Sequence, residues 1–287
     1  MLRKLIIYTV LVIFMIVGVD TLIYFVYPNI SRLKKENPVK TAFMEYRHKQ
    51  WVKKGRKKEI IQNWAPLERI SPYLIKAVII AEDDKFFSHD GFDFDAMQKA
   101  LEKNIKKGKF SSGGSTISQQ LAKNLFLSPS KNPIRKIKEA ILTWRLEHTL
   151  SKKRIMELYL NVAEWGDGIF GIQVAALHYF NKSAYELGPK ESARLASVLP
   201  NPVRFNANGD SEYIANRSER IYRIMVQRGI VIPEYDDLMN TSQIGADDGP
   251  GDTPPAADAT SSDQPAASSD TEIEKDPPNN SIDEKIE

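Results

Sequence analysis

The stretch GKFSSGGSTISQQLAKN, residues 108–124, decides between two fold classes. Its first half has the spacing of a nucleotide-binding phosphate loop, with Gly108, Gly113 and Ser115 in place, but Gly114 stands where that motif has lysine. Such a loop also follows a β-strand, whereas the lysine-rich residues before Gly108 have helical spacing. The stretch therefore predicts a loop that turns into a helix capped at Ser115, and it disfavours a nucleotide-binding α/β fold.

Apolar residues recur with helical spacing on both sides of this stretch. Cap or first-turn residues predict helix starts at Ser71 and Pro72, Asp93, Pro133 and Ser151, and helical patterns also cover 171–180, 189–198 and 211–228. No alternating strand pattern of useful length is present in the sequence. The folded part, predicted to cover residues 68–240, is therefore expected to be all-α.

Two of these helices carry a clear apolar stripe. In the helix after Pro133, Ile137, Ile141 and Trp144 are predicted to mark the buried face. In the helix after Asp93 the stripe consists of Phe94, Met97, Leu101 and Ile105.

The N-terminal segment 5–27 is predicted to be an uncleaved transmembrane anchor. Its 23 residues contain one charge, Asp20, and as a helix they would span about 34 Å, enough to cross a bilayer. Arg3 and Lys4 favour a cytoplasmic position for residues 1–4, with the folded domain outside the inner membrane. We interpret Asp20 as a solvated carboxylate at the outer interface, with pairing to a partner helix as the alternative.

The segment 28–67 is basic, with the aromatic residues Phe43, Tyr46 and Trp51 followed by KKGRKK at 53–58. Immediately outside a membrane span, this composition is typical of a stretch that lies on anionic headgroups. A solvated linker is the alternative.

The C-terminal segment 246–287 differs in kind. It contains 12 acidic residues and two lysines and no aromatic residue, so it is predicted to be disordered. Since the whole chain is +3, removing this net charge of −10 leaves +13 on residues 1–245. That basicity favours an anionic partner, which composition alone leaves open among lipid headgroups, a phosphorylated substrate and nucleic acid, with a merely solvated basic surface as the other reading.

Two groups of charged residues could carry chemistry. Glu82 directly follows a strongly apolar helical run, and desolvation raises a carboxyl pKa toward the range of a general acid or base. Acidic residues at a helix C-terminus oppose the helix dipole, although a merely polar helix exit explains them too. In residues 132–147, Arg135 and Glu139 are four apart beside Lys136. They form either a solvated ion-paired face or an anion-binding cluster.

Five sequence blocks in order carry a resemblance to a known family. They are EDxxFxxHxG from Glu82, GGSTISQQLAKN at 113–124, RKxKE at 135–139, KRIMELYLN at 153–161 and LASVLPNPVRFNA at 195–207. Together they resemble the family 51 glycosyltransferases, the peptidoglycan transglycosylases, over roughly residues 40–208. The chain is most similar to the monofunctional biosynthetic members, which have one membrane anchor. Ala207 departs from the usual proline, at a structural turn.

The resemblance implies a lysozyme-like helical domain that polymerises lipid II into β-1,4 glycan strands with inversion and release of undecaprenyl pyrophosphate. It implies catalytic roles for Glu82, as the base, and Glu139, as the carboxylate that orders cations or a divalent ion (Mg or Mn) at the pyrophosphate. The implied substrate-binding residues are Asp83, Ser115, Thr116, Gln119, Gln120, Lys123, Asn124, Arg135 and Lys136.

No protein-held metal site is predicted, because the four histidines have no metal-ligand spacing. The partners implied by the resemblance are lipid II, the growing glycan chain, membrane lipids and cell-wall synthesis or divisome proteins, and not nucleic acid. Two other functions stay open at this point: a lysozyme-type lytic enzyme that cleaves glycan, and a non-enzymatic membrane scaffold.

Overall fold

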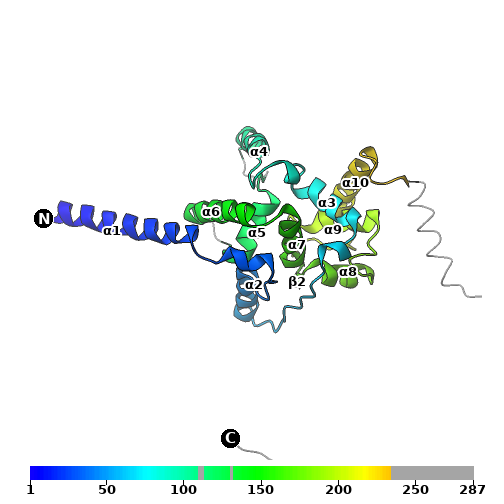
Figure 1. Ribbon diagram of the computed structural model, residues 1–287, viewed down its shortest axis with the longest axis horizontal. Coiled ribbons are helices and arrows are strands. Elements are labelled where there is room, and N and C mark those ends of the chain that lie inside the picture. The colour runs from blue at the N-terminus through cyan, green and yellow to red at the C-terminus, as the bar shows by residue number, and fades with distance from the viewer. Residues whose placement is uncertain (109–112, 130–131, 234–287) are drawn as a thin grey trace, which may run out of the picture. The chain divides into compact units, whose positions relative to one another are not determined.

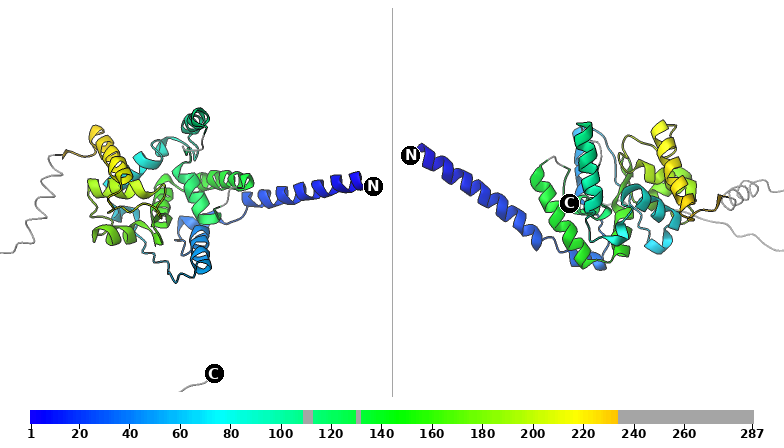
Figure 2. Two further views of the ribbon diagram at one scale, coloured as in Figure 1. Left: turned by 180° about the vertical axis from the view of Figure 1, so that it is seen from behind. Right: turned by 90° about the horizontal axis from the view of Figure 1, so that it is seen from above.

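The computed structural model describes residues 1–108, 113–129 and 132–233. These residues form helices joined by short loops and one two-stranded hairpin (Figures 1 and 2), which confirms the predicted all-α class apart from the hairpin. The α-helices and strands are α1 (Leu2–Leu22), α2 (Ala42–Lys53), α3 (Pro72–Glu82), α4 (Phe94–Lys107), α5 (Ile117–Phe126), α6 (Pro133–Thr149), α7 (Lys152–Val162), β1 (Glu164–Gly166), β2 (Ile169–Phe170), α8 (Ile172–Phe180), α9 (Pro189–Val198) and α10 (Glu212–Gln227). The short 3₁₀ helices are η1 (Ile23–Phe25), η2 (Ile30–Lys34), η3 (Leu67–Arg69) and η4 (Phe86–Ser88). The predicted acidic tail and residues 234–240 of the predicted domain lie outside the described residues.

Most predicted helix starts are confirmed. Asp93 and Ser151 cap α4 and α7 with side-chain oxygens that accept backbone N–H groups of the first turn. Pro133 is the first residue of α6. Ser71 occupies the N-cap position of α3, but its hydroxyl donates to the carbonyl of Leu187 at 2.7 Å instead of capping the helix.

The predicted cap of α5 was wrong by one residue. Thr116, and not Ser115, is the N-cap, and its hydroxyl accepts the N–H of Gln119 at 3.2 Å. The Gln119 side chain accepts the N–H of Thr116 at 3.0 Å in return, which completes a capping box. Ser115 is thereby left outside the helix with its hydroxyl available to a neighbour.

The core lies where α3, α5, α6, α7 and α9 meet. Fully buried aliphatic side chains come from each of these helices, among them Leu74, Leu121, Leu142, Leu158 and Leu195. Helix α10 packs against α3 and α9 and closes this core through Ile214, Ile221 and Met225. The burial of these side chains fixes the ends of α3, α5 and α6, which carry the candidate site residues.

Helix α2 packs against the domain, so one expectation for segment 28–67 was wrong. Trp51, expected on headgroups or in solvent, is 3% exposed and packs with Met44 and Phe170 in a small second core. The Trp51 indole donates to Asp167 in the turn of the hairpin at 3.3 Å. In the hairpin, the antiparallel strands β1 and β2 pair Glu164 with Phe170, and this short unit was not visible as a strand pattern.

The predicted buried face of α6 was also wrong. Ile137 and Trp144 are 54% and 47% exposed, while the buried side chains of this helix include Glu139 and Leu142. The stripe of α4 is exposed in the same way, with Phe94 73% and Ile105 70% exposed. Both stripes are real, but neither faces the core of the domain.

Helix α1 is long and apolar enough to cross a membrane, and none of its side chains is buried. It runs away from the other helices, and its C-terminal end lies beside α6 (Figures 1 and 2). Asp20, preferred as a solvated carboxylate, is 55% exposed, and it also pairs with Lys138 of α6. The pairing that was the alternative is thus found within the chain itself, beside the exposure that was preferred.

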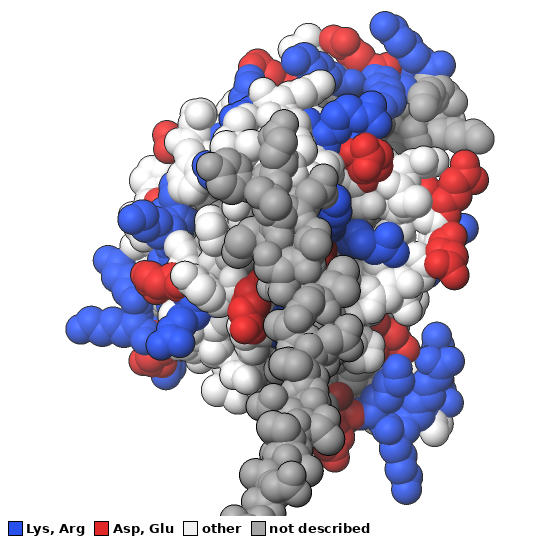
Figure 3. Space-filling model, turned by 90° about the vertical axis from the view of Figure 1, so that its right-hand side faces the viewer, with Lys and Arg blue, Asp and Glu red and all other residues white. Residues whose placement is uncertain are grey.

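Basic and acidic side chains are interspersed on the face shown in Figure 3. Among the residues coloured there, neither sign forms a continuous field.

Candidate active site

Glu82 is the last residue of α3 and its side chain is only 11% exposed. One carboxylate oxygen accepts the side-chain N–H of Gln120 at 2.9 Å, and the other accepts an Arg217 N–H at 3.2 Å. Burial raises the pKa of Glu82, and the hydrogen bond from Gln120 and the charges of Arg217 and Lys123 only partly oppose that rise. The affinity of the Glu82 carboxylate for a proton is therefore higher than that of a free carboxylate, which suits a general base.

Tyr159 of α7 completes this arrangement from the buried side. Its hydroxyl donates to the side-chain oxygen of Gln120 at 3.1 Å, which fixes the amide so that its N–H points at Glu82. Burial holds the pKa of Tyr159 well above its usual range, so the hydroxyl stays a donor. Sequence analysis did not single out Tyr159 because its spacing also fits the core stripe of α7.

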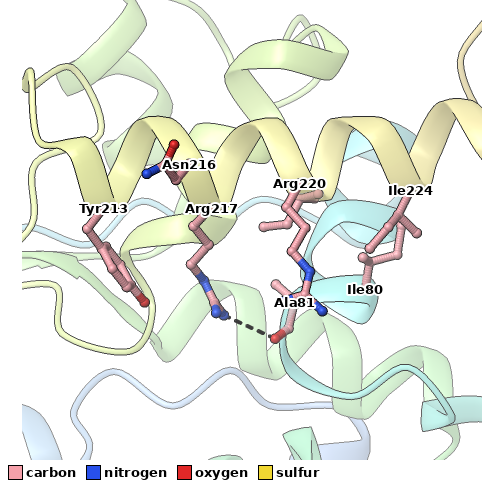
Figure 4. Close-up of a pocket in the computed structure, with 8 residues that line it drawn as sticks. Ile80, Ala81, Tyr213, Asn216, Arg217, Arg220 and Ile224 are labelled. Carbon is pink, nitrogen blue, oxygen red and sulfur yellow. Dashed lines mark hydrogen bonds between the residues drawn. The ribbon is translucent and has the colours of Figure 1, made fainter.

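Arg217 of α10 was also missed by the sequence analysis. The same guanidinium nitrogen that donates to Glu82 donates to the carbonyl of Ala81 at 3.1 Å, and Figure 4 shows this bond across a pocket of about 500 Å³ between α3 and α10. Its Nε atom is buried without a hydrogen-bond partner among the described residues. One arginine in a long amphipathic helix far along the sequence gives no signal that it meets Glu82.

Three expected substrate ligands have side chains that hold the fold together. Asp83 is buried, and its oxygens bond His89 at 2.9 Å and the backbone N–H of Ile117 at 2.9 Å. Thr116 and Gln119 are buried in the capping box, and the Thr116 hydroxyl donates to the carbonyl of Gly91 at 2.7 Å. The structure does not bring these three side chains to an open surface. They join the end of α3 to the start of α5.

The expected phosphate ligands do come together, around the buried Glu139. Arg135 donates to one Glu139 oxygen at 2.6 Å and Lys136 pairs with the other. Lys136 also donates to the hydroxyl of Ser115 at 3.2 Å, which ties the loop before α5 to α6. Burial lowers the pKa of Lys123, and the negative charges of Glu139 and Glu82 partly oppose that fall. We call Lys123, Arg135, Lys136 and Glu139 the phosphate cluster.

A small pocket of about 210 Å³ lies beside the phosphate cluster. The expected residues Gln120, Lys123 and Asn124 line it. The unexpected ones come from α2, α7, the hairpin and the loop after α9, and they include Phe43, Arg47, Tyr159, Glu164, Leu199, Pro200, Asn201 and Pro202. The pocket thus combines Lys123 and the Arg47–Glu164 ion pair with neutral polar side chains.

The residues do not fit a metal ion held by protein ligands alone. Glu139 is engaged through both oxygens by Arg135 and Lys136. Among the described residues, no group of three or more His, Cys, Asp or Glu side chains could hold a metal. A divalent ion would have to take most of its ligands from a bound pyrophosphate.

The geometry supports transfer of a group from an anionic leaving group to a hydroxyl. Glu82 supplies a buried base, and the phosphate cluster supplies three cations around one carboxylate. Lys123 links the two, because its charge acts on both Glu82 and Glu139. Such a set removes a proton at one end and neutralises developing charge at the other.

Comparison with known proteins agrees with this geometry. A family model described as Transglycosylase matches residues 48–226. A biosynthetic peptidoglycan transglycosylase of Dechloromonas aromatica is 52% identical over 182 residues, which are 63% of this chain and 79% of the relative. Proteins of the same name from Aromatoleum aromaticum and Janthinobacterium sp. are 57% identical over 169 residues and 46% identical over 224 residues. These two alignments cover 59% and 78% of this chain and 74% and 96% of the relatives.

Proposed function

The chain belongs to the transglycosylase family, and from that premise we propose that Glu82 is the general base of a lipid II polymerase. The protein is a peptidoglycan glycosyltransferase, as the family and the names of its relatives indicate. The observation that carries the proposal is the buried carboxylate of Glu82, held by Gln120 and Arg217 beside the phosphate cluster.

The proposed reaction divides the work between the two ends of the site. The 4-hydroxyl of the acceptor sugar loses its proton to Glu82 and attacks the anomeric carbon of the donor chain. The bond from that carbon to the pyrophosphate breaks on the opposite face, which inverts the configuration, and undecaprenyl pyrophosphate leaves with the bonding electrons. A pyrophosphate needs charge neutralisation and no proton to leave. Arg135 suits it as a planar donor and Lys123 and Lys136 as point charges.

Glu139 is proposed to order this cluster. It holds Arg135 and Lys136 in place from a buried position, so the cations meet the pyrophosphate already arranged. Gln120, Asn124 and Ser115 are proposed to donate to substrate oxygens, since each lies at the pocket or the cluster. Asp83, Thr116 and Gln119 are proposed to position α5 and not to touch the substrate.

We also propose the cellular arrangement. Helix α1 would cross the inner membrane with residues 1–4 in the cytoplasm and the domain in the periplasm, supported by its length and by Arg3 and Lys4. Membrane lipids and divisome or other cell-wall proteins are the partners that this position would offer. We propose that the transglycosylase domain starts at α2 and not near residue 68, since the family match begins at residue 48 and α2 packs on the hairpin. The acidic segment 246–287 would follow this domain.

The test is lipid II polymerisation by the full-length protein and by Glu82→Gln. We expect the variant to lose at least about a hundredfold in rate, because Gln keeps the shape and removes the base. Asp84→Asn is the matched control, since it makes the same change at a carboxylate two residues further along, which is 53% exposed and pairs with Arg228. Undiminished polymerisation by Glu82→Gln would remove the base from the mechanism. Cleavage of finished glycan without synthesis would instead assign a lytic enzyme.

A further inference from the structure

The junction between the membrane anchor and the domain is held by specific contacts. Lys138 of α6 pairs with Asp20 of α1, and its ammonium also lies 4.7 Å from the centre of the Tyr24 ring. The Lys138 side chain is only 14% exposed, while Asp20 is 55% exposed. The Lys138 side chain is thus covered by the C-terminal end of α1 and by η1.

Arg145, two turns further along α6, binds the chain that leaves the anchor. Its guanidinium donates to the carbonyls of Tyr24 at 2.9 Å, Val26 at 3.1 Å and Pro28 at 2.8 Å. Carbonyls at the end of a helix lack partners within it, and a cation there also suits the helix dipole. Together, Lys138 and Arg145 contact the chain at several points between Asp20 and Pro28. We call this set of contacts the anchor clamp.

The clamp fixes the anchor to the helix that carries the phosphate cluster. Lys138 follows Arg135 and Lys136 by three and two residues, which is about 3–5 Å of rise along α6. Asp20 in turn lies about 24 Å along α1 from Lys4, in the outer part of a hydrocarbon core that is about 30 Å thick. The cations that would hold a pyrophosphate are therefore tied to the anchor near its outer end.

We propose that the anchor clamp sets the height of the phosphate cluster above the membrane, so that the pyrophosphate of a lipid-linked sugar is bound while its lipid stays in the bilayer. The proposal rests on the proposed function. It makes Asp20, Lys138 and Arg145 positioning residues, which act through the placement of Arg135 and Lys136. It also makes the anchor part of the substrate-binding geometry and not only a tether.

The experiment compares two media for the full-length protein. In liposomes that contain lipid II, Lys138→Met should raise KM about fivefold with kcat changed less than about twofold, because it lowers substrate capture and leaves the chemistry intact. In detergent with a short-chain, water-soluble lipid II analogue, the same variant should match the wild type. Lys153→Met, the same change at an exposed lysine of α7, is the control in both media.

Three further results decide the interpretation. Asp20→Asn should reproduce the loss, and the double variant with Lys138→Met should lose no more than either single change, because both remove one interaction. Lys138→Arg should retain wild-type KM. An equal loss in detergent, or no loss in liposomes, would overturn the proposal. A wild type that makes no polymer in either medium would remove the proposed function itself, and the clamp with it.

Discussion

The environment of Glu82 favours its role as a base at a cost to the stability of the fold, because the carboxylate is buried. Burial raises its pKa, and Arg217 and Gln120 keep the carboxylate accessible as the ionised form. An apolar pocket without Arg217 and Gln120 would favour the protonated form more strongly, because nothing there would oppose the desolvation. The sequence could place Glu82 at the end of a buried helix, but not Arg217, because the two meet only through the packing of α10 on α3.

At this scale we expect Glu82→Gln to be more stable than the wild type at neutral and alkaline pH. A carboxyl whose pKa is raised by folding favours the folded state only while protonated, and that contribution is lost as pH rises through the folded pKa. Gln imitates the protonated form at every pH. The gain in melting temperature should therefore shrink as pH falls through the raised pKa of the folded state, and the change should be complete once pH is below the usual carboxyl range. Thermal unfolding of both proteins across pH measures it, and a gain independent of pH would contradict the assignment.

Arg217→Met should move the acid limb of the pH–rate profile to higher pH. Arg217 lowers the pKa of Glu82 through its charge and its hydrogen bond, so its removal raises that pKa further. The base is then protonated over more of the acidic range. The rate on the plateau should fall less than the rate on the acid limb. Arg223→Met, at an exposed arginine of the same helix, should leave the profile unchanged. The measurement is kcat/KM for polymerisation as a function of pH, and an unmoved acid limb in Arg217→Met would contradict the coupling.

Helices α5 and α6 show what sequence patterns could and could not predict. The start of each helix was predicted to within a residue, because caps and first-turn proline are local signals. The orientation of α6 was not, because its apolar stripe at Ile137 and Trp144 is exposed while Glu139 is buried. Helix α6 carries residues of the phosphate cluster and also contacts the anchor, so more than one of its faces makes contacts. Periodicity alone cannot say which of these faces is the core.

The start of α5 depends on one hydroxyl. Thr116 caps the helix and also donates to the carbonyl of Gly91, whose φ of 93° and close approach to Glu147 leave no room for a side chain. We expect Thr116→Ala to destabilise the fold by about 2 kcal/mol, roughly half from the cap and half from the second hydrogen bond. Denaturant unfolding measures this loss. Thr116→Ser keeps both bonds and should cost much less; an equal loss would show that packing of the methyl group dominates.

At the scale of the whole molecule, segment 28–67 contributes helix α2 to the folded domain, although its composition indicated a stretch on headgroups or a solvated linker. Helix α2 docks on the hairpin through Trp51 and through Arg47, which bonds the buried Glu164 at 2.7 Å. Arg47 also lines the small pocket, together with Gln120 and Lys123. The all-α fold class could be predicted because helix signals are local, while the site residues are predicted from ordered sequence blocks. The docking of α2 could not be predicted, because an arginine and a glutamate more than a hundred residues apart carry no shared local pattern.

Arg47→Met should destabilise the protein by about 2–4 kcal/mol at neutral pH, because it leaves Glu164 ionised in a buried site. Burial already raises the pKa of Glu164, and Arg47 opposes that rise. The loss should therefore diminish as pH falls and the carboxyl takes up a proton. Adding Glu164→Gln should restore most of the stability, since no uncompensated charge remains. Chemical denaturation of the single and double variants tests this, and a double variant as unstable as Arg47→Met would contradict it.

The buried lysine of the phosphate cluster has a consequence for the proton inventory of the cleft. Burial lowers the pKa of Lys123, and the charge of Glu139 partly opposes that fall. A bound pyrophosphate would bring further negative charge to the same place and shift that pKa upward. By reciprocity, the proton on Lys123 and the bound pyrophosphate stabilise each other. Departure of the product reverses the shift.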